Sequence, residues 1–220
     1  MVVDHPGTLV DEATAAVAVD GRRVQLEPKV YLLLHKPRGP LSTAADYRGR
    51  QTVLDLLGDA EERLYPAGRL DADTEGLLLI TNDGDLTFRL THPSHEVDKV
   101  YEADVPGQPS ALALRQLEQG VLLEDGLTRP ARVRLLRSSP AGSRLELTIH
   151  EGRKRQVKRM LKAVGHPVQA LKRTRVGPLT LGDLPVGAWR HLTEDEVERL
   201  RTATEKAAPT AGAAESGEET

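Results

Sequence analysis

Residues 68–84 read Gly68-Arg-Leu-Asp-Ala-Asp-Thr-Glu-Gly-Leu-Leu-Leu-Ile-Thr-Asn-Asp-Gly84, a stretch whose character changes at its midpoint. Its first half is polar and rich in Gly and Asp, which excludes a long helix there. Leu77 to Thr81 is an apolar run closed by a turn signal, so we expect a buried strand. Asp71 therefore lies on a loop before a core strand. Such a loop is a usual place for a catalytic group, and its Asp and Gly residues are also typical of an ordinary turn.

Strands and helices are mixed irregularly on both sides of this stretch. No internal repeat is visible and the connections are hairpin-like, so the sequence predicts an α+β fold rather than a doubly wound sheet. A capping box at Thr193–Glu196 opens the last helix. The other expected elements are a hairpin around Asp20-Gly21, strands at 31–35, 97–105, 131–136, 144–150 and 168–176, a short helix at 52–57, and helices at 85–90, 110–119 and 151–164.

The charge of the chain is unevenly distributed. The sequence has 30 Lys+Arg and 33 Asp+Glu, a net charge of −3, which argues against a nucleic-acid partner. However, residues 203–220 lack large apolar side chains and carry four acids and one Lys, so we expect a disordered acidic tail. Residues 150–176 hold nine bases and one acid. This segment is either a solvated basic helix face or a surface that binds a polyanion.

Composition excludes several classes of protein. The absence of cysteine rules out disulfides, thiolate catalysis and cysteine-bound metal centres. There is no apolar run long enough to span a membrane and no visible secretory signal, so we expect a cytoplasmic protein. His92 and His95 are not expected to bind metal, because Pro93 between them breaks any shared helical face.

A set of motifs extends from about Tyr31 to about Leu200. Its segments are residues 68–84, Lys99-Val-Tyr-Glu102, Ile149-His-Glu-Gly-Arg-Lys-Arg-Gln-Val-Lys-Arg-Met160, Gly165-His-Pro-Val168, Leu171-Lys-Arg-Thr-Arg-Val-Gly-Pro178, Leu181–Gly187 and Arg190–Thr193. In content and order these motifs resemble those of the ribosomal RNA pseudouridine synthases of the RsuA/RluB branch. The third motif is closest to that of the B type, which acts on large-subunit RNA.

The resemblance implies the fold and the reaction. The fold would be a mixed, mainly antiparallel sheet in two subdomains, with flanking helices and a central RNA-binding cleft. The enzyme would cut the C1′–N1 bond of a uridine, turn the uracil and rejoin it through C5, without cofactor or metal. Its partner would be ribosomal RNA or a ribosomal precursor particle, and we expect a monomer.

The resemblance also assigns roles to individual residues. Asp71 would be the catalytic carboxylate, acting on the sugar either by attack at C1′ or by removal of a sugar proton. Lys158 would be its counter-ion, where many relatives have Arg, and could instead belong to the solvated basic face. Tyr101 would stack on the flipped uracil, Arg69 would support the flipped nucleotide, and Leu171 would form an apolar wall; Tyr101 and Leu171 could also be plain core residues. The residues expected to track RNA phosphates are Arg153, Arg155, Arg159, Lys172 and Arg175.

Three segments are expected along the chain. Residues 1–27 resemble the closing hairpin of a truncated N-terminal RNA-binding domain, residues 28–202 form the catalytic domain, and residues 203–220 form the tail. The sequence also allows two other functions. One is a non-catalytic RNA-binding or ribosome-assembly factor on the same fold, which the presence of Asp71, Tyr101 and Lys158 disfavours. The other is a glycosidase with Asp71 and Asp73 as its carboxylate pair, which their short spacing disfavours.

Overall fold

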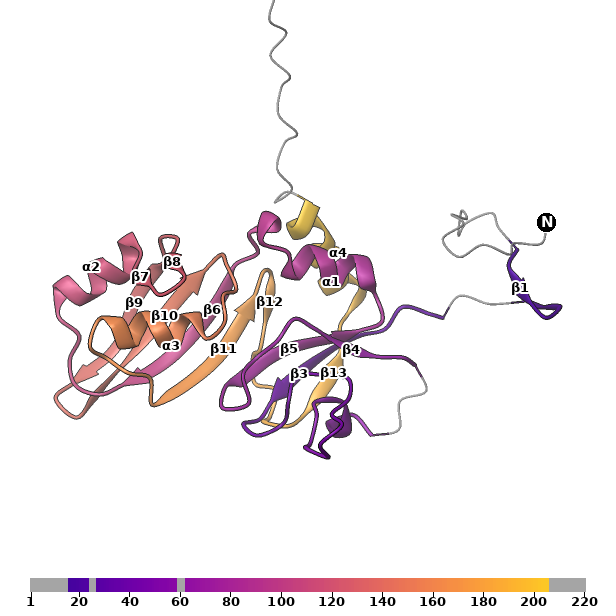
Figure 1. Cartoon of the computed structure of the whole chain (residues 1–220), viewed down its shortest axis with the longest axis horizontal. Coiled ribbons are helices and arrows are strands. Elements are labelled where there is room, and N and C mark those ends of the chain that lie inside the picture. The colour runs from indigo at the N-terminus through magenta and orange to yellow at the C-terminus, as the bar shows by residue number, and fades with distance from the viewer. Residues whose placement is uncertain (1–15, 24–26, 59–61, 206–220) are drawn as a thin grey trace, which may run out of the picture.

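The computed structural model describes residues 16–23, 27–58 and 62–205 (Figure 1). Its centre is a nine-stranded sheet in the order β13-β3-β5-β11-β6-β10-β9, to which β4 adds beside β5 and β12 beside β11. The strands are β3 (Tyr31–Lys36), β4 (Tyr65–Ala67), β5 (Glu75–Thr81), β6 (Lys99–Val105), β9 (Arg132–Ser139), β10 (Gly142–Ile149), β11 (Ala170–Val176), β12 (Leu179–Thr180) and β13 (Trp189–His191).

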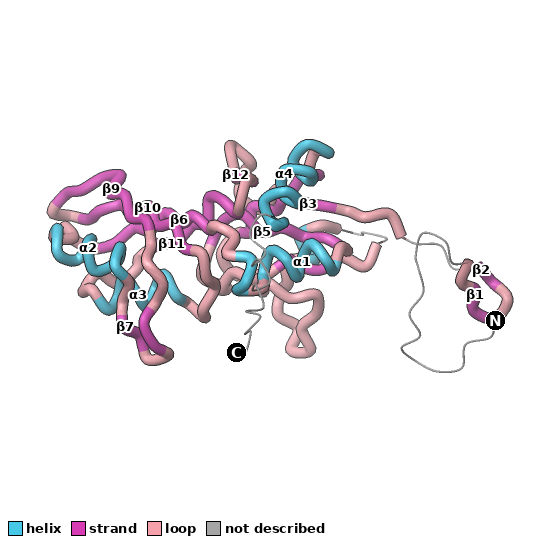
Figure 2. The backbone as a smooth tube through the Cα atoms, turned by 90° about the horizontal axis from the view of Figure 1, so that it is seen from above, coloured by secondary structure: helices cyan, strands magenta, loops and turns pink. Residues whose placement is uncertain are grey.

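Four α-helices lie in the described part of the chain, two against each half of the sheet (Figures 1 and 2). They are α1 (Gly84–Thr91), α2 (Ala111–Gln119), α3 (Gln156–Ala163) and α4 (Glu194–Glu205). Short 3-10 helices occur at Leu54–Leu56 and Pro93–His95. Two small hairpins are not hydrogen-bonded to the main sheet. One consists of β1 (Ala18–Val19) and β2 (Arg22–Arg23), and the other of β7 (Leu122–Leu123) and β8 (Gly126–Leu127).

Strands β3 and β5 are buried on both faces, which explains their uninterrupted apolar sequences. Alternate residues of β3 enter two different apolar clusters: Leu32 and Leu34 belong to one and Leu33 to the other. Helices α2 and α3 contribute to the first cluster, and α1 and α4 to the second. The β6–β10 half has only one apolar face, because Glu102 and Asp104 alternate with buried residues along β6.

The two halves of the sheet are joined by the pairing of β5 with β11. This is the single parallel pair among the described ladders, and it aligns Lys172 with Glu75 and Arg173 with Gly76. Gly76 has a φ of 120°, and a Cβ at this position would lie 2.2 Å from the carbonyl oxygen of Arg173. Only glycine therefore allows the two backbones to approach this closely.

The structure confirms the α+β class and a mixed, mainly antiparallel sheet. The hairpin around Asp20-Gly21 is present, with Ala18 opposite Arg23. The expected helix at 151–164 is wrong at its start: α3 begins at Gln156, and residues 151–155 form a loop. Arg155 ends that loop in the left-handed region, with a φ of 52°, which interrupts a helix. The loop is instead fixed by its side chains, as described below.

Helix α4 begins at the expected capping box. The backbone N–H of Glu196 donates a hydrogen bond to the Thr193 hydroxyl at 3.2 Å. In return, the backbone N–H of Thr193 donates to the Glu196 carboxylate at 3.0 Å. The helix continues to Glu205 and fully buries Thr204, so residues 203–205 are not part of a tail. Residues 206–220, and residues 1–15 and 24–26 of the expected N-terminal remnant, lie outside the described residues. Among the helices that are described, none is long and apolar enough to cross a membrane.

The capping box of α4 gives a test of stability. The Arg190 guanidinium donates two 2.7 Å hydrogen bonds to Glu196 and lowers the pKa of that carboxyl from 4.5 to about 2. Because the pKa is lowered in the folded state, the stabilisation is complete above pH 4.5 and is lost as the pH falls towards 2. We expect Glu196→Gln to lower the free energy of unfolding at pH 7 by about 1–2 kcal/mol, allowing for solvent screening at Arg190.

Urea unfolding at several pH values measures this effect. The difference between wild type and Glu196→Gln should shrink as the pH falls below 4.5. Glu198→Gln is the matched control, because Glu198 is exposed on the same helix and forms no ion pair within residues 62–205. A difference that stays constant down to pH 2 would contradict the assigned role of the Arg190–Glu196 pair.

Candidate active site

The loop of residues 68–74 carries Asp71 between β4 and β5, and backbone contacts hold it in place. The Thr74 N–H donates to the Asp71 carbonyl at 3.0 Å, and the Gly39 N–H donates to the Ala72 carbonyl at 2.7 Å. The Ser42 hydroxyl donates to the Leu70 carbonyl at 2.9 Å and accepts the Leu70 N–H at 3.1 Å. The loop is thus fastened to the segment that follows β3.

Lys36, the last residue of β3, is fully buried beneath this loop. Its ammonium donates to four backbone carbonyls, those of Pro37, Asp71, Ala72 and Thr74, at 2.9 to 3.4 Å. Burial lowers the pKa of Lys36 from 10.5 to about 8, and the nearby charges of Asp73 and Asp71 oppose this shift. Lys36 is not among the site residues expected from the sequence. Its place at the end of an apolar strand was the one signal that could have identified it.

Lys158 reaches the loop from α3, in the other half of the molecule. Its Nζ lies 3.3 Å from Oδ2 of Asp71, 2.5 Å from Oδ1 of Asp73 and 2.8 Å from Oγ1 of Thr74. Arg155 adds a second cation, 3.4 Å from the other oxygen of Asp73. The hydrogen bond from Lys158 and the two positive charges lower the pKa of Asp73. The expected pairing of Lys158 with Asp71 is present, and Asp73 shares the same ammonium.

A cavity of about 440 Å³ opens beside Asp71, a volume in the range of small-ligand pockets. Tyr101 and Leu171 line it and are 9% and 5% exposed. Both residues also belong to the first apolar cluster, so each is a core residue and at the same time part of the cavity wall. Arg69 is exposed, lines the same cavity and forms no ion pair in the part of the chain that the structure describes. In that part, no three His, Asp or Glu side chains converge as metal ligands would.

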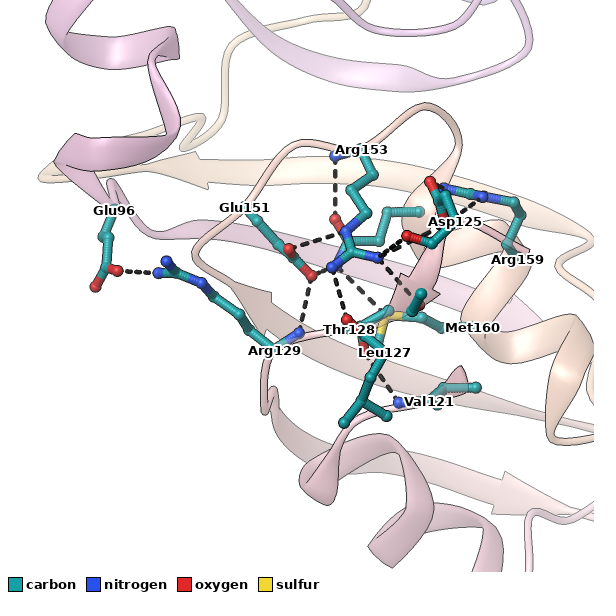
Figure 3. A network of polar contacts seen from close by, with 12 residues as sticks. Glu96, Val121, Asp125, Leu127, Thr128, Arg129, Glu151, Arg153, Arg159 and Met160 are labelled. Atoms are coloured by element: carbon teal, nitrogen blue, oxygen red, sulfur yellow. Dashed lines mark hydrogen bonds and ion pairs between the residues drawn. The ribbon is translucent and has the colours of Figure 1, made fainter. Parts of the chain in front are cut away.

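Arg153 and Arg159 are bound to the β7–β8 hairpin rather than directed to solvent (Figure 3). The Arg153 guanidinium donates to the carbonyls of Gly126 and Leu127 at 3.1 and 2.6 Å and to the Glu151 carboxylate at 3.1 Å. Arg159 forms a two-pronged pair with Asp125, with both distances 2.9 Å. These contacts fix the loop of residues 151–155, which lines the cavity.

Lys172 and Arg175 lie on the opposite face of the sheet from the cavity. In the β6–β11 ladder they pair with Glu102 and Val100, which alternate with Tyr101 along β6. Lys172 contacts Glu75, with 3.6 Å between Nζ and Oε1. The structure therefore does not gather the five expected phosphate-binding residues into one patch. Two of the five, Arg153 and Arg155, line the cavity. Arg153 is bound to the β7–β8 hairpin, whereas Arg155 is not.

Residues 30–163 match the model of the RNA pseudouridylate synthase family. The chain belongs to this family. It is 49% identical over 187 residues to the ribosomal large subunit pseudouridine synthase B of Bacillus subtilis, covering 84% of this chain and 77% of that protein. It is 43% identical over 202 residues to an uncharacterized RNA pseudouridine synthase of Aquifex aeolicus, covering 90% and 80%. These relatives confirm the RsuA/RluB-type resemblance.

A solved structure supports the same assignment. A crystal structure of a pseudouridylate synthase superposes with a TM-score of 0.73 at 35% identity and covers 80% of this chain and 75% of that one. An archaeal box H/ACA complex of Nop10 and Cbf5 matches at a TM-score of 0.50 and 17% identity, a similarity of fold alone. The chain is therefore an RNA pseudouridine synthase, an isomerase.

Lys158 gives a test of the site's electrostatics. We expect Lys158→Ala to lower the single-turnover rate of pseudouridine formation about 10²-fold, because two carboxylates then lose a shared cation. RNA affinity should change much less, and Lys158→Arg should restore most of the rate. Lys162→Ala is the control, because Lys162 is exposed on the same helix. If Lys158→Ala weakens only salt-sensitive RNA binding, Lys158 belongs to an RNA-binding surface instead of the site.

Proposed function

We propose that this synthase converts a uridine of large-subunit ribosomal RNA into pseudouridine, with Asp71 as the catalytic carboxylate. The substrate follows from the similarity to the large-subunit synthase of Bacillus subtilis. The single observation that carries the role of Asp71 is its position: its carboxylate borders the cavity and faces the Lys158 ammonium at 3.3 Å. The C1′–N1 bond of the uridine breaks, the uracil turns, and C5 bonds to C1′.

The contacts of Asp71 leave it able to react. Lys158 lies closer to Asp73 than to Asp71, so Asp73 takes the larger share of the cation. Oδ1 of Asp71 accepts no hydrogen bond from the residues that the structure describes. A carboxylate oxygen held by a rigid loop and free of partners can attack C1′ or remove a sugar proton. Either route would use the carboxylate of Asp71.

The cavity suits a uracil turned out of folded RNA. The ring of Tyr101 offers a stacking surface worth about 1–3 kcal/mol per base. Leu171, across the β6–β11 ladder, adds an apolar wall. These two side chains would hold the base while the glycosidic bond is broken, and they would keep water from the reacting carbon.

The backbone of the RNA would be held at the rim of the cavity. Arg69 and Arg155 are exposed there and can reach phosphates. Arg153 and Arg159 instead position the β7–β8 hairpin, since their guanidiniums already bind its oxygens. Affinity should fall with salt in proportion to the phosphates contacted, and selection of the uridine would rest on RNA shape.

The alternatives fit the geometry less well. A non-catalytic RNA-binding factor has no need of a carboxylate with a free oxygen at the mouth of a cavity. A glycosidase needs two carboxylates on opposite sides of a sugar. Asp71 and Asp73 contact the same Lys158 ammonium, which lies where the sugar would have to lie.

Asp71→Asn tests the proposal. The amide cannot act as nucleophile or base, so we expect pseudouridine formation to be lost while RNA binding survives. Primer extension after chemical labelling of pseudouridine in ribosomal RNA, from cells with and without the gene and complemented by each variant, measures this. Asp183→Asn is the control, because Asp183 is exposed and forms no ion pair among residues 62–205. Retained turnover in Asp71→Asn would refute the role of Asp71, and a gene-dependent site only in small-subunit RNA would refute the substrate.

A further inference from the structure

Two cationic side chains in the cavity have no role in the steps above. Lys99, from β6, and Arg173, from β11, both line the cavity beside Tyr101. Arg173 is only 5% exposed. Burial, with the neighbouring charge of Arg173, lowers the pKa of Lys99 from 10.5 to about 8. Two positive charges are therefore held close together in a partly enclosed space.

Neither cation has a carboxylate partner within the described ranges. The Lys99 ammonium donates to the Val97 carbonyl at 2.9 Å, and the Arg173 Nε donates to the Leu77 carbonyl at 2.9 Å. The nearest acid in sequence, Asp98, pairs with Arg132 and His150 instead. Nη1 and Nη2 of Arg173 donate to no oxygen of residues 16–23, 27–58 or 62–205. Arg173 is buried and Lys99 is half-buried, and the only negative charge that acts on Lys99 in the described ranges is that of Asp98, which has other partners. Enclosed cations without a bonded counter-ion are unfavourable, so this pair points to an anion that arrives during function.

The strand register places both cations next to the expected position of the base. Arg173 is directly opposite Tyr101 in the β6–β11 ladder, and Lys99 is opposite Val176. Lys99 and Tyr101 are two residues apart in one strand, so their side chains share a face. A uracil stacked on Tyr101 would thus have a cation on the neighbouring strand and another along the same strand.

The reaction produces negative charge at that position. When the C1′–N1 bond breaks, its electron pair leaves with the uracil, and N1, O2 and O4 share the charge. When C5 bonds to C1′, C5 loses its proton and N1 gains one, so the base is neutral again. This charge pattern is the same whether Asp71 attacks C1′ or removes a sugar proton.

Resting on the proposed function, we propose that Lys99 and Arg173 are catalytic residues that stabilise the uracil anion between cleavage and rejoining. Fixed cations in a site with little water stabilise a charge that exists only after bond breaking. They therefore raise the rate of the bound substrate rather than its affinity. An RNA phosphate is the other anion to consider, and the test below separates the two.

Lys99→Met tests the proposal in the full chain. We expect a loss of about 10²-fold in the single-turnover rate at saturating RNA, with the affinity and its salt dependence unchanged. Lys99→Arg, which keeps the charge, should retain most of the rate. Lys162→Met is the matched control on the exposed face of α3. Thermal unfolding of each variant establishes that it is folded.

A second substrate separates an electrostatic role from a structural one. Fluorine at C5 withdraws electrons and stabilises the departing uracil anion, so 5-fluorouridine RNA needs the cations less. The deficit of Lys99→Met in C1′–N1 cleavage, relative to wild type, should shrink on this substrate. An equal deficit on both substrates would mean a structural role, and a reduced salt slope of binding would mean a phosphate contact; either result overturns the proposal.

The proposed function is tested separately in the same experiment. Wild-type turnover on ribosomal RNA tests the substrate, whereas the ratio of variant to wild-type rates tests Lys99. Arg173→Lys gives an independent check if Lys99→Met does not fold. The Lys ammonium carries the same charge on a shorter side chain, so the displaced charge should lower the rate on uridine RNA more than on the fluorinated RNA. A rate equal to wild type on both RNAs would contradict the role of Arg173.

Discussion

Lys36 ends strand β3 with its ammonium inside the protein, where four backbone carbonyls surround it. A buried charge is tolerated only when such dipoles replace water, and the loop that supplies three of them carries Asp71. The requirement works in both directions: the carbonyls stabilise the cation, and the cation fixes the path of residues 71–74. The loop that carries Asp71 is thus anchored to a strand that is buried on both faces.

The candidate site exists because two halves of one sheet meet at this anchored loop. Asp71 and Asp73 come from the β4–β5 connection, and Lys158 comes from α3, which packs on the β6–β10 half. Gly76 allows β5 to lie against β11 closely enough for this meeting. Arg173 of β11 pairs with Gly76 of β5 on one side and with Tyr101 of β6 on the other, so β11 links the loop that carries Asp71 to the wall of the cavity.

Much of this was predictable from the sequence, because apolar runs and capping residues are local signals. The strand at Leu77–Thr81, the helix at 110–119 and the capping box of the last helix are confirmed. What could not be predicted depends on contacts between distant residues. Arg153 and Arg159 belong to a basic segment, but their partners lie in a hairpin about 30 positions earlier. The predicted start of α3 was wrong because these contacts override the amphipathic pattern of residues 151–155. The placement of Lys99 and Arg173 in one cavity had no local signal, because it depends on the pairing of strands that are distant in sequence.

Amide hydrogen exchange in Lys36→Met tests the central claim that the buried ammonium fixes the loop that carries Asp71. The amides of Gly39 and Thr74 report on it, since they donate to the carbonyls of Ala72 and Asp71. We predict that their exchange accelerates at least about tenfold, equivalent to about 1.4 kcal/mol, relative to amides in the centre of β5, which report global unfolding. Unchanged protection of Gly39 and Thr74, with Lys36 replaced, would contradict the account.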